Sequence, residues 1–320
     1  MGVGTCFELA HERGVGQVGV RCWRGPVVDK MLTVEYHIPV PLTTEEYRIG
    51  MMYMIAKSSL QEAMAAQDAA VSKASRPIHI RRNEPYYANE HGLPNPGQYT
   101  EKKYNLRAHL PKFVAAMVPE SASYVVEYAW NAFPVCRTTY EAPMFGEKFV
   151  LTIDSIYADD QTAASNKFGL SKKELSERQV CLLDMCSEEF VPFESNSSEN
   201  PTLWKSTKAS RGGIKKDFWK TAVSSRASFP LMYAYKLVRL EFRKLGLQTK
   251  VEQWGQRYGM RNNFIRYTRR IVCWADEWYG LSMEDVRQME DQATALTGRT
   301  STDTEDVELE CDQPAVEVAV

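Results

Sequence analysis

The sequence predicts an α+β domain in which long helices lie against one antiparallel β-sheet. Three observations lead to this fold class. An alternating segment and a helix open the domain, strand-like runs separated by turns occupy its middle, and helical periodicity returns only near the end. Strands and helices segregated along a chain are typical of an antiparallel sheet with helices on one side. One sheet gripped by a C-terminal helix would leave a cavity between the two.

A strand followed directly by a helix opens the domain. Apolar and polar residues alternate from 31 to 40, as in a half-buried strand, with the apolar positions at Leu32, Val34, Tyr36, Ile38 and Val40. Thr43 and Glu46 then match a capping box, because an N-cap threonine and a glutamate three residues later satisfy each other's backbone N–H groups. The helix that follows is predicted to continue through an Ala-rich stretch to about Ser75.

The middle of the chain is predicted to form the sheet. Residues 76–160 are interrupted by the turn clusters NEP, HGLPNPG and VPES, which separate strand-like runs. Further strand-like runs are KFVLTIDSIY, RQVCLLDM and YAYKLVRLEF. Residues 194–213 are rich in Ser, Pro and Gly, so a long loop is predicted there.

The last third is predicted to be helical. Bulky apolar residues recur three or four positions apart, as on one face of a helix, at Phe264, Tyr267, Ile271, Trp274 and Trp278. A final helix is predicted from Ser282, as its N-cap, to about Gly298. These elements complete the expected helical layer.

Composition restricts the class of protein. The 320 residues carry a net charge of −2, with 44% hydrophobic and 25% charged residues, which are ordinary values for a globular chain. The balanced charge argues against a general nucleic-acid binder, which carries a basic excess. The sequence has no run of about 18 apolar residues and no secretory signal. We therefore expect a cytoplasmic protein and no nucleic-acid partner.

The two ends of the chain differ from the rest. Residues 1–30 show no periodicity and are predicted to be a flexible N-terminal extension, with Met31 as an alternative start. The GVGQVG segment there lacks the flanking strand and helix that a dinucleotide site requires. Residues 299–320 carry seven acids and, beyond Arg299, no base, which predicts an acidic disordered tail. A single domain is therefore predicted over residues 31–298.

A basic segment lies between the sheet and the last helices. From Lys205 to Arg226 there are seven basic residues and one acid. This charge predicts either an ordinary solvated loop or attraction to an anionic membrane surface, at about 1 kcal/mol per basic residue close to it. The basic positions are Lys205, Lys208, Arg211, Lys215, Lys216, Lys220 and Arg226.

The sequence offers no catalytic motif. The five histidines have no metal-ligand spacing, and no HExxH, GxSxG or P-loop segment occurs. We therefore expect no enzyme, no metal site and no cofactor.

Four polar residues are unusual because each lies on a predicted apolar face. Thr100 and Lys102 share a strand face with Tyr104, Asn131 lies within a strand-like run, and Glu290 falls on the apolar stripe of the last helix. A buried polar group is costly unless it is hydrogen-bonded. Each could instead have an ordinary explanation: Thr100 and Lys102 could lie at the solvent-exposed end of an edge strand, and Glu290 could lie at the edge of its apolar stripe and reach solvent. One buried ligand with a phosphate and several hydroxyls would satisfy all four together.

Several blocks of the sequence resemble phosphatidylinositol transfer proteins. They run in order from about Met31 to Glu290, so the resemblance covers most of the chain. The blocks are EYHIPVPLTTEEYRIGMMYMIAK, NEPYY, GQYTEKKY, WNAFPVCRT, STKASRG, YAYKLVRLEF, GLQTKVEQ and CWADEWYGLSMEDVRQME. The FPVCRT block is similar to the classical soluble subgroup, whereas CWADEWYGLSM is similar to the membrane-associated, retinal-degeneration-type subgroup.

The resemblance implies a START-like helix-grip fold, in which a concave, mostly antiparallel sheet and long helices enclose one phospholipid. It also implies that Thr100, Lys102, Asn131 and Glu290 contact the inositol head group. Cys136 and Tyr267 match positions near the head group or acyl chains. Lys244 and Leu245 stand where the family often has an exposed aromatic pair that enters the bilayer, so membrane entry there is expected to be weaker.

The expected function is therefore carriage of phosphatidylinositol between membranes in exchange for phosphatidylcholine or phosphatidic acid, without chemistry. Such a carrier would touch membranes transiently, through Lys205, Lys208, Arg211, Lys215, Lys216, Lys244 and Leu245. A lipid sensor that presents phosphatidylinositol to phosphoinositide kinases is the alternative. A hydrolase in the same kind of cavity is a third reading, which the missing nucleophile–base motif disfavours.

Overall fold

The computed structural model describes most of the predicted domain. The described residues are 31–68, 78–90, 93, 95–105, 119, 123–189, 191–193, 198–222, 229–243 and 248–297. The predicted extension at 1–30, the predicted tail at 299–320, and Lys244 and Leu245 lie outside them.

A single large sheet forms the centre of the fold. It has eight strands in the order β2-β3-β4-β5-β6-β10-β1-β7, and every neighbouring pair is antiparallel except β1 and β7. Its strands are β1 (Leu32–Val40), β2 (Ile78–Tyr86), β3 (Gly97–Asn105), β4 (Tyr124–Ala132), β5 (Val135–Glu141), β6 (Phe149–Ala158), β7 (Gln179–Leu182) and β10 (Met232–Phe242). A separate hairpin pairs β8 (Lys205–Ser206) with β9 (Arg211–Gly212).

Helices lie around this sheet. They are α1 (Thr44–Asp68), α3 (Lys172–Glu177), α4 (Phe218–Ala222), α5 (Gln248–Trp254), α6 (Asn262–Cys273), α7 (Ala275–Trp278) and α8 (Met283–Thr297). A π-helical segment, η7 (Gly255–Arg261), joins α5 to α6, and 3₁₀ turns occur at η5 (Gly146–Lys148) and η6 (Pro201–Leu203). The predicted α+β class and START-like fold are confirmed, with one large, mostly antiparallel sheet and long helices against it.

The predictions for individual helices and loops are only partly correct. The capping box is present, since Glu46 Oε2 accepts from the Thr43 backbone N–H at 2.8 Å and Thr43 Oγ1 accepts from the Glu46 N–H at 3.2 Å. The aromatic stripe from Phe264 to Trp278 is not one helix, because α6 ends at Cys273 and α7 is a separate short turn. The π-helical segment and the β8–β9 hairpin, which lies inside the predicted 194–213 loop, were not predicted.

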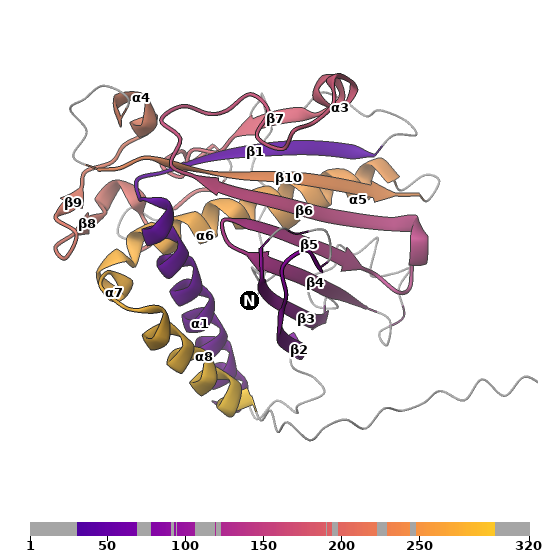
Figure 1. Ribbon diagram of the computed structural model, residues 1–320, viewed down its shortest axis with the longest axis horizontal. Helices are drawn as coiled ribbons and strands as arrows, with labels where there is room; N and C mark the ends of the chain where they lie inside the picture. Colours follow the sequence, from indigo (N-terminus) through magenta and orange to yellow (C-terminus); the bar gives the residue numbers. More distant parts are fainter. Residues whose placement is uncertain are drawn as a thin grey trace, which may run out of the picture.

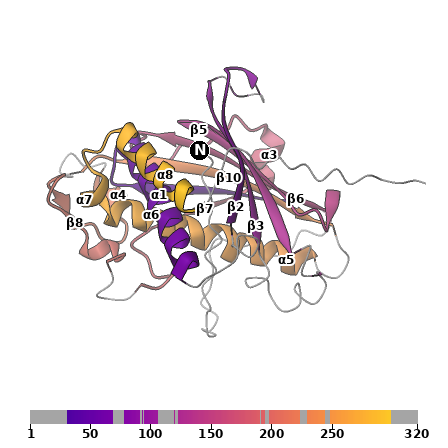
Figure 2. The ribbon, with the colours of Figure 1, turned by 90° about the horizontal axis from the view of Figure 1, so that it is seen from below.

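One face of the sheet, the inner face, is covered by α5, η7 and α6 (Figures 1 and 2). Tyr36 on β1 shows the contact: its hydroxyl donates to Gln256 Oε1 at 2.9 Å, and its ring meets Phe264 edge-on at 5.4 Å. Helices α1 and α8 lie side by side along one side of the sheet (Figures 1 and 2). No helix in the described parts of the chain is long and apolar enough to span a membrane.

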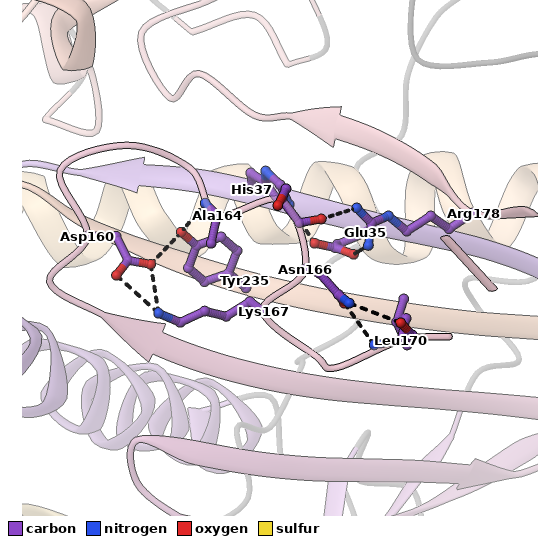
Figure 3. Close-up of polar contacts among 10 residues, drawn as sticks. Glu35, His37, Asp160, Ala164, Asn166, Lys167, Leu170, Arg178 and Tyr235 are labelled. Atoms are coloured by element: carbon purple, nitrogen blue, oxygen red, sulfur yellow. Dashed lines mark hydrogen bonds and ion pairs between the residues drawn. The ribbon is translucent and has the colours of Figure 1, made fainter. Parts of the chain in front are cut away.

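The opposite face, the outer face, is crossed by residues 159–178, here called the strap, which connect β6 to β7 over β10 and β1. Figure 3 shows its polar contacts. At one end Asp160 accepts from the Tyr235 hydroxyl at 2.7 Å and pairs with Lys167 at 2.8 Å. At the other end Arg178 pairs at 2.8 Å with Glu35, which is fully buried and also bonds His37 at 2.6 Å. The strap is thus fastened to the sheet by charged side chains.

Candidate functional site

A row of polar side chains crosses the inner face of the sheet. Antiparallel register places directly paired residues on the same face. The register pairs Asn131 with Cys136, Cys136 with Ser155, Ser155 with Lys236, and Lys236 with Tyr36, which is the residue that contacts η7 and α6. This polar row therefore faces the helices, inside the protein.

A second polar group lies beside that row on β3 and β4. Thr100 is 3% exposed and Lys102 is 9% exposed, and Lys102 is paired in the ladder with Glu127. Glu127 is completely buried, and its Oε2 accepts a hydrogen bond of 2.5 Å from the Tyr140 hydroxyl. A lysine and a carboxylate are thus buried opposite each other on the inner face.

Asn131 shows most clearly that this region is adapted to something besides the protein. Both its Nδ2 and its Oδ1 are buried, and neither has a hydrogen-bond partner among the described residues. A buried amide in that state costs about 1–3 kcal/mol per unsatisfied group. The Asn131 backbone packs tightly on β3, since a Cβ added at Gly97 would lie 2.0 Å from the Asn131 carbonyl oxygen. The side-chain donor and acceptor are therefore available to a ligand.

Lys236 brings a buried positive charge to the polar row. Its ammonium donates to the hydroxyls of Ser155 at 3.2 Å and Tyr157 at 3.3 Å and lies 5.1 Å from the Phe264 ring centroid. Burial lowers its pKa to about 8, because the charged form loses its hydration. An anionic group bound beside it would raise that pKa again. Lys236 is thus a suitable partner for a phosphate.

Glu290 approaches the same region from helix α8. Burial raises the pKa of its carboxyl to about 7, while the positive charge of Lys102 acts in the opposite direction. The two residues lie more than 180 positions apart in the sequence, on β3 and on α8, yet they interact electrostatically. Helix α8 thus places Glu290 within electrostatic range of Lys102 on β3.

At the far end of β10 the inner face is apolar. A cavity of about 80 Å³ lies there between the sheet and α5–η7, lined by Val125, Tyr140, Ala142, Phe145, Phe149, Leu151, Leu240, Phe242, Val251, Trp254, Gly255, Gly259 and Met260. Six residues of strand separate Lys236 from Phe242, which is about 20 Å at the usual rise of about 3.3 Å per residue. The inner face of the sheet thus has a polar end and an apolar end.

The structure places the sequence-predicted site residues as follows. Thr100, Lys102, Asn131 and Cys136 lie on the inner face, and Glu290 lies on α8, where the charge of Lys102 influences the pKa of its carboxyl. Tyr267 lies on α6 and is 6% exposed within the main apolar core. The predicted docking lysines lie elsewhere, on or just after the β8–β9 hairpin, and Arg211 pairs there with Glu46 at 2.8 Å.

Sequence reasoning missed three residues of this site, namely Glu127, Ser155 and Lys236. The sequence contained a signal for two of them, Lys236 and Glu127. Lys236 alternates in phase with Ala234, Val238 and Leu240, and Glu127 with Val125 and Ala129. The rule that singled out Thr100 and Lys102, a polar residue on an apolar strand face, would also have found them. Ser155 is small and common in strands, so nothing distinguished it.

The arrangement suits one amphiphilic ligand. Hydroxyl-binding groups and a phosphate partner gather at the polar end, and aromatic and aliphatic side chains line the other end. Among the described residues no group of three or more His, Cys, Asp or Glu could hold a metal ion.

Comparison with known proteins agrees with this geometry. Residues 31–295 match the family model described as phosphatidylinositol transfer protein. Phosphatidylinositol transfer protein 1 of Dictyostelium discoideum is 39% identical over 262 residues, which is 81% of this chain and 92% of that protein. Human membrane-associated phosphatidylinositol transfer protein 2 is 36% identical over 84% of this chain and 19% of its own length. Protein retinal degeneration B of Drosophila melanogaster is 38% identical over 82% of this chain and 20% of its own.

Proposed function

Because the chain belongs to the phosphatidylinositol transfer protein family, we propose that it holds one phosphatidylinositol under its sheet and exchanges it between membranes for a second phospholipid. Its family consists of lipid transfer proteins and not of enzymes, so the action is physical carriage. The observation that carries the proposal is the buried amide of Asn131, which has no hydrogen-bond partner in the described protein and lies beside a row of polar groups.

The head group is assigned to the polar end. Asn131 offers a donor and an acceptor to inositol hydroxyls, and Thr100 adds a hydroxyl. Lys102 and Glu290 extend the same contact from β3 and α8. Glu127, buried opposite Lys102, is added as an acceptor. A head group without these hydroxyls would leave the buried amide of Asn131 unsatisfied, which is the basis proposed for selectivity.

The phosphate is assigned to Lys236. It is the buried cation of the polar row, and Ser155 and Tyr157 hold its ammonium in place. Every phospholipid has a phosphate, so this contact serves the second lipid as well. Lys236 therefore supports binding in general, whereas Asn131 and Thr100 discriminate.

The acyl chains are assigned to the apolar end. Transfer of a chain into water costs about 0.8 kcal/mol per CH₂, so two chains of roughly 30 methylenes together would cost about 24 kcal/mol. The cavity of about 80 Å³ is smaller than two chains, so the apolar residues around it, such as Phe145, Phe149 and Trp254, are proposed to move apart around the chains and offset that cost. This enclosure lets a lipid cross water without meeting it.

The second lipid is proposed to be phosphatidylcholine or phosphatidic acid. Cys136 lies between Asn131 and Ser155 in the polar row and is 2% exposed, so the second head group would pass close to its thiol. The cargo is a phospholipid, and the proposal requires no cofactor. The protein is proposed to act in the cytoplasm with transient membrane contact.

An alternative is a lipid sensor that binds phosphatidylinositol and presents it to phosphoinositide kinases without bulk transfer. Both proteins would bind the same lipid in the same way. A vesicle assay with fluorescent, quenched phosphatidylinositol separates them, because only a carrier moves label from donor to acceptor vesicles.

Native mass spectrometry with lipid extraction tests the proposed site. Wild type, Thr100→Glu and Lys236→Met are loaded from mixed vesicles of phosphatidylinositol and phosphatidylcholine. Wild type is expected to bind one phospholipid per chain, with both species present. Thr100→Glu is expected to lose phosphatidylinositol and keep phosphatidylcholine. Lys236→Met is expected to lose both.

Two results would contradict the assignment. If the wild-type protein bound no phospholipid, the proposed function would be refuted. Retention of phosphatidylinositol by Thr100→Glu would keep the function and refute the head-group site.

A further inference from the structure

One end of the molecule gathers positive charge around the β8–β9 hairpin. Figure 1 shows β8, β9 and α4 together at this end, far from α5 and the end of β10. Four lysines there are exposed: Lys205, Lys208, Lys215 and Lys216. No ion pair joins any of them to a carboxylate in the described part of the chain, whereas neighbouring Arg211 pairs with Glu46 and Lys220 with Asp217.

An exposed apolar residue stands beside these lysines. Leu203 is 58% exposed, although its neighbours Pro201 and Trp204 are buried. It belongs to the 3₁₀ turn η6, whose N-cap Asn200 accepts from the Thr202 backbone N–H at 3.0 Å. Because buried side chains hold the turn on both sides, the exposure of Leu203 is built into the fold.

The hairpin itself is also fixed. The carboxylate of Asp276, at the start of α7, accepts from Ser206 Oγ at 2.5 Å, from the Thr207 N–H at 3.0 Å and from the Lys208 N–H at 3.1 Å. Residues 206–208 therefore do not need to become ordered when a partner binds. Preorganised contacts lose less entropy on association.

We propose that Leu203 with Lys205, Lys208, Lys215 and Lys216, here called the basic tip, docks on an anionic membrane. The inference rests on the proposed function, since a lipid carrier must meet membranes. Leu203 enters the boundary between head groups and acyl chains, and the lysines remain among the anionic head groups.

The chemistry of the basic tip favours a lipid surface over an acidic protein. All four unpaired cations are lysines, which act as point charges and suit a diffuse layer of phosphates. Protein interfaces favour arginine and are depleted in lysine. The arginine of the hairpin, Arg211, is directed to Glu46 of its own chain.

The basic tip lies far from Arg243, the last described residue before the other predicted docking positions (Figure 1). Lys244 and Leu245 lie outside the described residues, but Arg243, directly before them, donates its backbone N–H to Lys148 at 2.7 Å at the far end of β10. Ten residues of β10 separate its ends, Met232 and Phe242, which is about 33 Å of strand. The basic tip therefore lies at the opposite end of β10 from Arg243 (Figure 1).

Co-sedimentation of the full chain with vesicles tests the basic tip. Vesicles of phosphatidylcholine with about 30% phosphatidylserine are compared with pure phosphatidylcholine, at about 0.1 M and about 0.5 M salt. Each lysine is expected to contribute about fivefold in affinity, so Lys205→Gln with Lys208→Gln is expected to weaken binding about 25-fold. Leu203→Ser is expected to weaken it about fivefold, and high salt should remove most binding.

Matched controls lie elsewhere on the surface. Leu182→Ser removes another exposed apolar side chain, and Lys172→Gln with Lys173→Gln removes two exposed charges on α3. Both controls are expected to bind as wild type does, and all variants should keep their phospholipid in native mass spectrometry.

Three results would overturn the basic tip: variants within twofold of wild type, equal losses in the controls, or equal binding to uncharged vesicles. Binding of poly-glutamate but not of anionic vesicles would also overturn it, in favour of an acidic protein partner. Normal loading with phosphatidylinositol alongside any of these results would leave the proposed function intact.

Discussion

The two faces of the sheet both bury charged side chains, but they satisfy them differently. On the outer face, Glu35 is buried between Arg178 and His37, at 2.8 and 2.6 Å. On the inner face, Asn131 has two buried polar atoms without a hydrogen-bond partner in the described protein, and Lys236 has hydroxyls and aromatic rings as its neighbours. The outer charges are paired with opposite charges, whereas the Asn131 amide has no hydrogen-bond partner in the described protein and can take a ligand.

This difference teaches how to separate structure from function among buried polar residues. Burial alone does not distinguish a structural residue from a ligand-binding one, since Glu35 and Glu127 are both 0% exposed. The partners distinguish them. Glu35 is held by the strap, a segment of the chain whose contacts end on the sheet, while Glu127 lies opposite Lys102 in a space that also contains Asn131. Mutations on the outer face should therefore change mainly the free energy of unfolding, and mutations on the inner face should change mainly phosphatidylinositol binding.

The largest expected effect is on the outer face. Glu35→Gln keeps the shape of the side chain but leaves the guanidinium of Arg178 buried without its counter-charge. Removing one partner of a buried ion pair costs about 3–5 kcal/mol. Urea denaturation should show that loss in the free energy of unfolding. Phosphatidylinositol bound per folded molecule should not change.

An exposed ion pair on the same face provides the control. Glu84 pairs with Arg82, and their side chains are 47% and 56% exposed. Glu84→Gln should change the free energy of unfolding by about 0–1 kcal/mol. If Glu35→Gln cost no more than this control, the strap would not be fastened by the buried charge.

A smaller effect of opposite sign is expected on the inner face. Asn131→Leu replaces an unsatisfied buried amide with an apolar side chain of similar size, so protein loaded with phosphatidylcholine should gain about 1 kcal/mol in stability. Phosphatidylinositol binding should fall at least tenfold. Urea denaturation and competitive loading measure the two quantities. A loss of stability would mean that Asn131 supports the fold itself.

The sequence predicted the fold class and most of the inner site for physical reasons. Strand alternation places every second residue on one face, so Thr100, Lys102 and Asn131 could be recognised as polar side chains on an apolar face. Glu290 was found in the same way from helical spacing. Resemblance then connected these positions, which lie far apart in the sequence, to one ligand.

The outer face could not be predicted in the same way. Glu35 and His37 occupy ordinary polar positions of a half-buried strand, and nothing local shows that the strap will cover them. Their burial depends on a crossover connection from β6 to β7, which is a long-range feature of topology. Residues such as Leu203 were missed for a related reason, because exposure of an apolar side chain is decided by the packing of its neighbours.

The last expected effect is a pH dependence at Glu290. Burial raises the pKa of this carboxyl to about 7 from its usual 4.5, so between those values the folded protein binds more protons than the unfolded chain. Stability therefore falls as pH rises through this window. Glu290→Gln cannot ionise, so in protein loaded with phosphatidylcholine it should exceed wild type in melting temperature at about pH 8 and match it at about pH 4.

The same measurement with phosphatidylinositol bound extends the comparison of the two faces. Inositol hydroxyls that donate to the Glu290 carboxylate would stabilise its charged form and lower its pKa. The gap between wild type and Glu290→Gln at about pH 8 should then shrink or reverse. An unchanged gap with either lipid would mean that Glu290 does not contact the head group, and its burial on α8 would be structural, as that of Glu35 is on the outer face.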